Sequence, residues 1–121
     1  MNMFRGIISL RNKGIGFFYR NFMKKIFFSM DPEDVHDRTV RMGKLLGSNF
    51  ITRGITYSKL GYFNNILNQR VLGIEFKNPI GLAAGFDKNA ELTKIIPSVG
   101  FGFEEIGSIT GERCEGNPKP R

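Results

Sequence analysis

Apolar side chains recur at three- and four-residue intervals over residues 15–30. This period matches the α-helix, and the pattern predicts a helix with one wide, aromatic-rich apolar face. That face is formed by Ile15, Phe18, Tyr19, Phe22, Met23, Ile26, Phe27 and Met30. The opposite, polar face is formed by Arg20, Asn21, Lys24 and Lys25. Such a helix is suited to a membrane interface or to packing on its own domain, and the pattern leaves both open.

A second helix is predicted to begin at Asp31 and to end at Gly47. Asp31 can accept hydrogen bonds from free N–H groups of the first turn, and Pro32 suits the first helical position. Glycine is common just where a helix stops. The apolar face of this helix is formed by Val35, Thr39, Met42 and Leu46. The two helices would form a hairpin within residues 1–47.

The middle of the chain is weakly patterned. Residues 48–70 are interpreted as a linker that contains a short helix. Apolar and polar residues then alternate from Arg70 to Lys77, which predicts one strand. Asn78 and Pro79 end it. We therefore divide the chain into a helical hairpin (1–47), a linker (48–70) and a strand-containing domain (71–121).

Residues 78–110 predict a strand, a short helix and a second strand. The first strand is a brief apolar run around Ile80 and Leu82, as in the buried strands of parallel sheets. Residues 89–99 are long enough for a short helix, and residues 100–106 predict the second strand. Connections of this kind join parallel strands in nearly all cases. The fold class is therefore α/β.

Both predicted strands end in small residues. Ala83, Ala84 and Gly85 follow the first strand, and Gly107 and Ser108 follow the second. Backbone without bulky side chains lets a flat or phosphorylated ligand approach closely. Ligands of α/β proteins bind at the carboxyl ends of strands, so we expect these two segments side by side as walls of one ligand site.

The distribution of charge narrows the choice of partners. The 121 residues carry a net charge of +7, and every charged residue before Asp31 is basic. These residues are Arg5, Arg11, Lys13, Arg20, Lys24 and Lys25. A basic amphipathic helix favours an anionic membrane surface, whereas the high pI alone leaves a small nucleic-acid-binding module as an alternative. A mitochondrial targeting segment over residues 1–30 is a third hypothesis.

Other kinds of site are not expected. Cys114 is the only cysteine and His36 the only histidine, which argues against an internal disulfide and against zinc or iron–sulfur sites. Cys114 is interpreted as having no functional role. Glu104 and Glu105 are neighbours in a strand and would face opposite ways, so they are not an acid–base pair.

Three segments in this order resemble dihydroorotate dehydrogenase, and its quinone-dependent, membrane-associated class most closely. They are residues 81–89 (GLAAGFDKN), 100–110 (GFGFEEIGSIT) and 115–121 (EGNPKPR). A weaker resemblance covers residues 31–42. The resemblance implies an eight-stranded (β/α)8 barrel preceded by a helical hairpin. Such a barrel takes about 250 residues, so we expect the chain to be the first part of a longer enzyme.

The resemblance also implies FMN as cofactor, in contact with two segments. The flavin-contacting residues would be Ala84, Gly85, Phe86, Asp87, Lys88, Gly107 and Ser108. Lys88 would in addition bind the carboxylate of the substrate. From the residues alone Asp87 can equally cap the following helix. No catalytic residue is expected within the chain, because the family's serine base lies on a later barrel loop.

The implied reaction oxidises dihydroorotate to orotate, in pyrimidine biosynthesis, and a quinone then reoxidises the flavin. His36 would belong to the quinone tunnel, with Phe18 and Phe22 on its wall. The implied protein is a monomer without metal or nucleic acid, peripheral on the cytoplasmic face of the bacterial inner membrane, or else mitochondrial. The 121 residues alone would be inactive. A soluble relative that uses fumarate or NAD is the alternative, but the basic hairpin argues against it.

Overall fold

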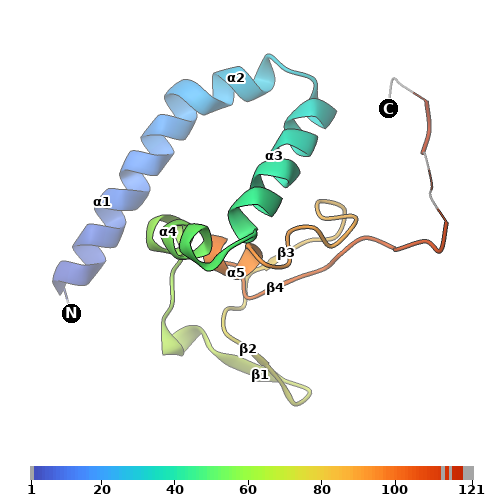
Figure 1. The fold of residues 1–121 in the computed structure, drawn as a ribbon. Coiled ribbons are helices and arrows are strands. Elements are labelled where there is room, and N and C mark those ends of the chain that lie inside the picture. The colour runs from blue at the N-terminus through green and yellow to red at the C-terminus, as the bar shows by residue number, and fades with distance from the viewer. Residues whose placement is uncertain (1, 113, 115, 119–121) are drawn as a thin grey trace.

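A computed structural model describes residues 2–112, 114 and 116–118 (Figure 1). Helices fill the first half and short strands the second. The helices are α1 (Asn2–Phe18), the π-helix η1 (Tyr19–Met23), α2 (Lys24–Phe28), α3 (Pro32–Gly47), α4 (Phe50–Leu60), the 3-10 helix η2 (Asn65–Leu67) and α5 (Ile96–Val99). The strands are β1 (Gln69–Val71), β2 (Ile74–Phe76), β3 (Gly81–Leu82) and β4 (Phe103–Glu104). The chain therefore has the mixed helix and strand content expected of the α/β class.

The first helical arm is longer than the sequence pattern predicted. α1, η1 and α2 follow one another without a break from Asn2 to Phe28, whereas a helix was expected only from residue 15. The apolar period is weak before that point, and Gly6 and Gly14 lower helix propensity there. A turn at Ser29 and Met30 leads into α3, which runs back at an angle to the first arm (Figure 1). No helix in the described part of the chain is both long and apolar enough to cross a bilayer.

The start of α3 is where the local sequence signals placed it. Oδ1 of Asp31 accepts hydrogen bonds from the N–H groups of Glu33 (2.8 Å) and Asp34 (3.4 Å). Pro32 occupies the first turn, and Glu33 and Asp34 place negative charge at the positive end of the helix dipole. A cap of this kind stabilises a helix by about 1 kcal/mol.

The linker predicted for residues 48–70 is largely structured. It contains α4, which contacts α3 and α5, and Thr56 of this helix is buried. Asn49 caps α4 by accepting from the Thr52 N–H at 3.0 Å. The Thr52 hydroxyl donates to the Leu46 carbonyl (2.6 Å) and Arg53 to the Gly47 carbonyl (2.8 Å). These bonds satisfy carbonyl groups at the end of α3 that have no partner within the helix. The spacing of apolar residues along residues 48–70 does not indicate such contacts with another helix.

The single strand predicted from Arg70 to Lys77 is wrong. β1 and β2 form an antiparallel hairpin in which Gln69 pairs with Phe76 and Val71 with Ile74. Leu72 (φ 49°) and Gly73 (φ 83°) form the two-residue turn. Two-residue hairpin turns favour positive φ at both central positions, and Gly73 adopts it without strain. The alternating pattern was correct for a strand but did not show where it folds back.

β3 and β4 are parallel, as predicted, with Gly81 opposite Phe103 and Leu82 opposite Glu104. The predicted helix between them is reduced to the four residues of α5, which ends at Gly100 in the left-handed region (φ 99°). Gly102 packs so closely on the backbone of Asn78 that a Cβ would overlap it. The side chain of Asn78 donates to the Gly100 carbonyl at 2.8 Å. This close approach aligns the starts of the two strands.

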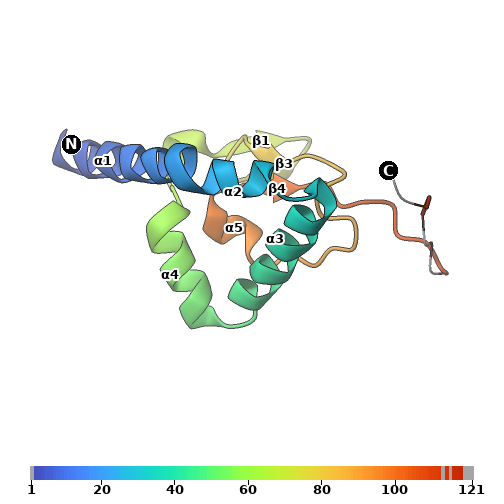
Figure 2. The ribbon, with the colours of Figure 1, turned by 90° about the horizontal axis from the view of Figure 1, so that it is seen from above.

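The core is small and lies between α3, α5 and the segment just before α5. It consists of Val40, Leu92, Ile95 and Ile96. Figure 2 shows α5 between α3 and α4. Gly43 and Gly47 of α3 leave room for Leu92 and Ile95, because a Cβ at Gly43 would overlap a Leu92 methyl group. Docking of α3 thus positions the segment that follows β3.

Candidate functional site

The loop after β3 is organised by Asp87, whose side chain is only 1 % exposed. Its Oδ1 accepts from the Glu91 N–H at 2.9 Å and its Oδ2 from the Leu92 N–H at 2.7 Å. Both oxygens therefore satisfy backbone groups that would otherwise be buried without partners. The alternative expectation that Asp87 caps the following helix is wrong, because α5 begins only at Ile96 and has no side-chain cap, and the Asp87 carboxylate instead ties together the loop before it. Only the backbone of Asp87 is left to contact a ligand.

The end of β4 packs directly on this loop. The Gly107 N–H donates to the Asp87 carbonyl at 3.0 Å. A Cβ on Gly107 would lie 2.8 Å from Cα of Lys88, so only glycine fits without a shift of the backbone. The second small-residue segment therefore meets the loop after β3, but at Asp87 and Lys88 and not at the expected Ala84 and Gly85.

Lys88 stands where two open pockets meet. One pocket of about 440 Å³ lies between α3 and the loop after β3 and is lined by Glu33, His36, Asp37, Val40, Arg41, Lys44, Phe86, Asp87, Lys88, Asn89 and Glu91. The other, of about 830 Å³, lies along the segment after β4 and its lining includes Lys88, Asn89, Ser108, Thr110 and Asn117. The structure thus brings Lys88 and Ser108 to one pocket. Ala84 and Gly85 are exposed and line neither.

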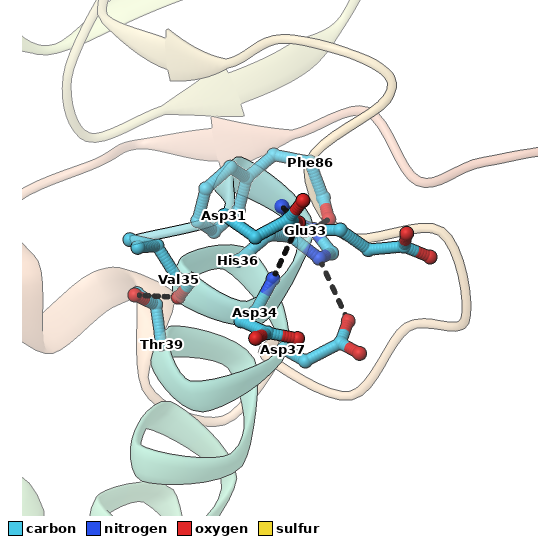
Figure 3. A network of polar contacts seen from close by, with 8 residues as sticks. All are labelled: Asp31, Glu33, Asp34, Val35, His36, Asp37, Thr39 and Phe86. Atoms are coloured by element: carbon cyan, nitrogen blue, oxygen red, sulfur yellow. Dashed lines mark hydrogen bonds and ion pairs between the residues drawn. The ribbon is translucent and has the colours of Figure 1, made fainter. Parts of the chain in front are cut away.

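His36 joins α3 to the loop after β3 (Figure 3). Its Nε2 lies 2.7 Å from the Phe86 carbonyl oxygen and therefore donates a hydrogen bond. The imidazole also meets the Phe86 ring edge-on, with centroids 5.1 Å apart. Nδ1 lies 3.3 Å from Oδ1 of Asp37. The only histidine of the chain therefore contacts the predicted flavin-contacting segment through Phe86.

Phe18 and Phe22 lie on the other helical arm. Their rings stack at 5.5 Å and both are half exposed. The lining of the pocket beside His36 comes from α3 and residues 86–91 and includes neither phenylalanine. The three residues proposed for one tunnel are thus not gathered at one described pocket.

Glu104 has an environment that the sequence did not indicate. Its Oε2 is buried and has no hydrogen-bond partner in the described part of the chain. Burial raises the pKa of this carboxyl, and the negative charge of Asp87 raises it further. Glu105, its neighbour, is exposed, as expected for opposite faces of a strand. Among the described residues no group of three His, Cys, Asp or Glu could hold a metal ion.

Comparison with known proteins connects this geometry to one family. Residues 66–121 match the family model described as dihydroorotate dehydrogenase. Over these residues the chain is similar to the dihydroorotate dehydrogenase family. The match includes β1 to β4, Lys88 and Ser108, and the resemblance inferred from residues 81–89, 100–110 and 115–121 is confirmed.

Individual relatives extend the similarity towards the N-terminus. Dihydroorotate dehydrogenase (quinone) of Helicobacter acinonychis is 40% identical over 98 residues, which cover 81% of this chain and 28% of that protein. The mitochondrial quinone enzyme of Mus musculus is 42% identical over 92 residues, covering 76% and 21%. The crystal structure of the Eimeria tenella enzyme with ferulenol matches with a TM-score of 0.53 and 35% identity, covering 75% and 22%. The chain spans about a quarter of the length of the curated relatives that it matches.

Proposed function

We propose that the chain supplies the helical hairpin and the first strand–helix–strand unit of a quinone-dependent dihydroorotate dehydrogenase. The unit would begin an eight-stranded barrel at residues 71–121. The observation that carries the proposal is the meeting of Lys88 with Gly107 and Ser108 at the ends of two parallel strands, within the family match. Relatives named as quinone enzymes favour this class over the soluble ones that use fumarate or NAD.

The residues present fit a flavin at this position. Gly85 has φ 98°, and no atom lies within 4 Å of where its Cβ would be, so the backbone there is open to a flat ring. FMN, when bound, would accept a hydride from the substrate. The backbone of residues 84–88 and 107–108 would hydrogen-bond the ring edge through carbonyl and N–H groups other than the Gly107 N–H, which is bonded to the Asp87 carbonyl. Asp87 and Gly107 hold that backbone in place.

Lys88 is the residue that would act on substrate. It is exposed and lines both pockets. Its ammonium would bind the carboxylate of dihydroorotate or orotate and stabilise negative charge on the reduced ring. The base that removes a proton from the substrate is expected on barrel loops not included in these 121 residues. The 121-residue chain alone is therefore expected to be inactive.

The helical arms would lead a quinone to the flavin and rest on a membrane. His36 contacts the flavin-contacting loop through Phe86, whereas Phe18 and Phe22 remain exposed on the other arm. We place the enzyme on the cytoplasmic face of a bacterial inner membrane, in pyrimidine biosynthesis, as a monomer. The mitochondrial inner membrane is the alternative, since both bacterial and mitochondrial relatives match.

The test is a visible spectrum of the protein expressed from its native reading frame, with any coding sequence that follows Arg121. Bound flavin should bleach with dihydroorotate under anaerobic conditions and return with a quinone. Lys88→Met should slow bleaching about a hundredfold, the scale for losing one positioned donor, whereas Lys94→Met, at an exposed position on the same segment, should not. A colourless, folded product would overturn the proposal.

A further inference from the structure

Three residues stand at the boundary between the two open pockets of the candidate site. Among the described residues, only Glu33, Lys88 and Asn89 line both the pocket of about 440 Å³ beside α3 and the pocket of about 830 Å³ along the segment after β4. Lys88 and Asn89 belong to the loop after β3, whereas Glu33 comes from the first turn of α3. A cation and a carboxylate therefore share this boundary, and the proposed chemistry uses only the cation.

The position of Glu33 is fixed by the way α3 begins and docks. The Glu33 N–H donates to Oδ1 of Asp31 at 2.8 Å, which caps the start of the helix. One turn further on, Nε2 of His36 donates to the Phe86 carbonyl at 2.7 Å and joins α3 to the loop that carries Lys88. Figure 3 shows the Glu33 side chain extending away from the helix axis beside His36. The carboxylate is thus carried by a helix that is attached to the same loop.

The two pockets offer different chemistry on the two sides of this boundary. The pocket along the segment after β4 presents hydroxyl and amide groups beside the Lys88 ammonium, from Ser108, Thr110 and Asn117. Such groups suit a polar anion. The pocket beside α3 has apolar surface from Val40 and Phe86, which suits a flat, neutral ligand. Its charged groups are of both signs, and the Arg41 guanidinium would attract a carboxylate into it unless the boundary repels one.

We propose that Glu33 is a specificity-determining residue, whose carboxylate keeps anionic dihydroorotate and orotate at Lys88 and leaves the pocket beside α3 to a neutral quinone. The inference rests on the proposed function, in which a quinone reaches the flavin beside His36. A carboxylate in the first turn is stabilised by the positive end of the helix dipole. Repulsion between like charges a few ångströms apart near a protein surface weakens binding by about tenfold, whereas a neutral ring is not repelled.

The test uses the protein expressed from its native reading frame, with any coding sequence that follows Arg121, and titrates it with orotate by isothermal titration calorimetry. The unsubstituted protein should bind one orotate per chain. Glu33→Gln should bind a second orotate, which a short-chain benzoquinone displaces, because the affinity of the pocket beside α3 for the anion rises about tenfold. Asp34 lies in the same helical turn and lines neither pocket, so the control Asp34→Asn, which removes the same charge, should keep one site.

Steady-state kinetics provides a second measurement that a merely structural change would not affect. At saturating dihydroorotate, orotate should raise the KM for quinone in Glu33→Gln without lowering kcat, which is competition for one pocket. Glu33→Asp keeps the charge and should show no such competition. One orotate site in Glu33→Gln, or a second site in Asp34→Asn as well, would overturn the proposal. No orotate binding by the unsubstituted protein would overturn the proposed function itself, and far-UV circular dichroism verifies that each variant keeps its helices.

Discussion

The segment around β3, α5 and β4 and the helical arm of α1, η1 and α2 use apolar side chains in opposite ways. In the first, Leu92, Ile95 and Ile96 are buried against α3, and Asp87 ties the loop to the same core. In the second, Phe17, Phe18 and Phe22 are half exposed or more. Burial of apolar side chains stabilises the candidate site. The arm leaves its apolar side chains exposed, as surfaces that contact a membrane or another protein do.

Truncation of apolar side chains should show the largest contrast. Ile95→Ala removes a core side chain and should lower the free energy of unfolding by about 3 kcal/mol, because the cavity adds to the lost burial. Phe22→Ala removes a larger side chain from the arm but should cost less than about 0.5 kcal/mol. Urea unfolding followed by far-UV circular dichroism measures both. An equal decrease in the free energy of unfolding for the two variants would mean that Phe22 is packed against the rest of the protein as tightly as Ile95 is.

Removal of the Asp87 carboxylate should have the next largest effect. Asp87→Ala leaves the N–H groups of Glu91 and Leu92 without acceptors, at a cost of about 2–4 kcal/mol. Asp34→Ala removes an exposed carboxylate from the first turn of α3 and should cost less than about 1 kcal/mol. Hydrogen exchange of the amides in residues 88–92 should quicken only in the Asp87 variant. If hydrogen exchange of these amides is unchanged in Asp87→Ala, the Asp87 carboxylate does not hold the loop in place.

The contact between α3 and the loop is testable at His36, whose NMR signals are unambiguous because it is the only histidine. The neutral imidazole should carry its proton on Nε2, which donates to the Phe86 carbonyl. His36→Ala should cost about 1 kcal/mol, whereas His36→Gln can place a donor near the same point and should recover part of it. A proton found on Nδ1 in the neutral form would contradict this contact.

The smallest effect is expected at Glu104, and it depends on pH. The folded-state pKa is raised above the ordinary 4.5, so the folded protein binds more protons and stability falls as pH rises above about 4.5. Glu104→Gln removes the charge and should stabilise the protein at neutral pH, by less than about 1 kcal/mol because the carboxyl is only partly buried. Glu105→Gln is the exposed control. If the free energy of unfolding instead rises with pH in the unsubstituted protein and not in Glu104→Gln, the pKa of Glu104 is lowered by folding and the prediction is wrong.

Local signals predicted the elements whose ends are set by neighbouring residues. Asp31 and Pro32 started α3, Gly47 ended it, and Asn78 with Pro79 preceded β3. The prediction was incomplete for α4 and wrong for the strand from Arg70 to Lys77, because contacts between distant residues decide both. The helix α4 is capped by Asn49 but held by bonds from Thr52 and Arg53 to α3. The turn at Gly73 lay inside an alternating pattern that reads as one strand.

Four features follow from neighbouring residues alone: the helical cap at Asp31, the small residues after β3 and β4, the basic charge before Asp31 and the family resemblance of residues 66–121. Three others depend on packing between distant segments: the contact of His36 with Phe86, the contact of Gly107 with Lys88 and the burial of Asp87. Contacts between groups far apart in sequence depend on how whole elements pack, and no local pattern contains that information.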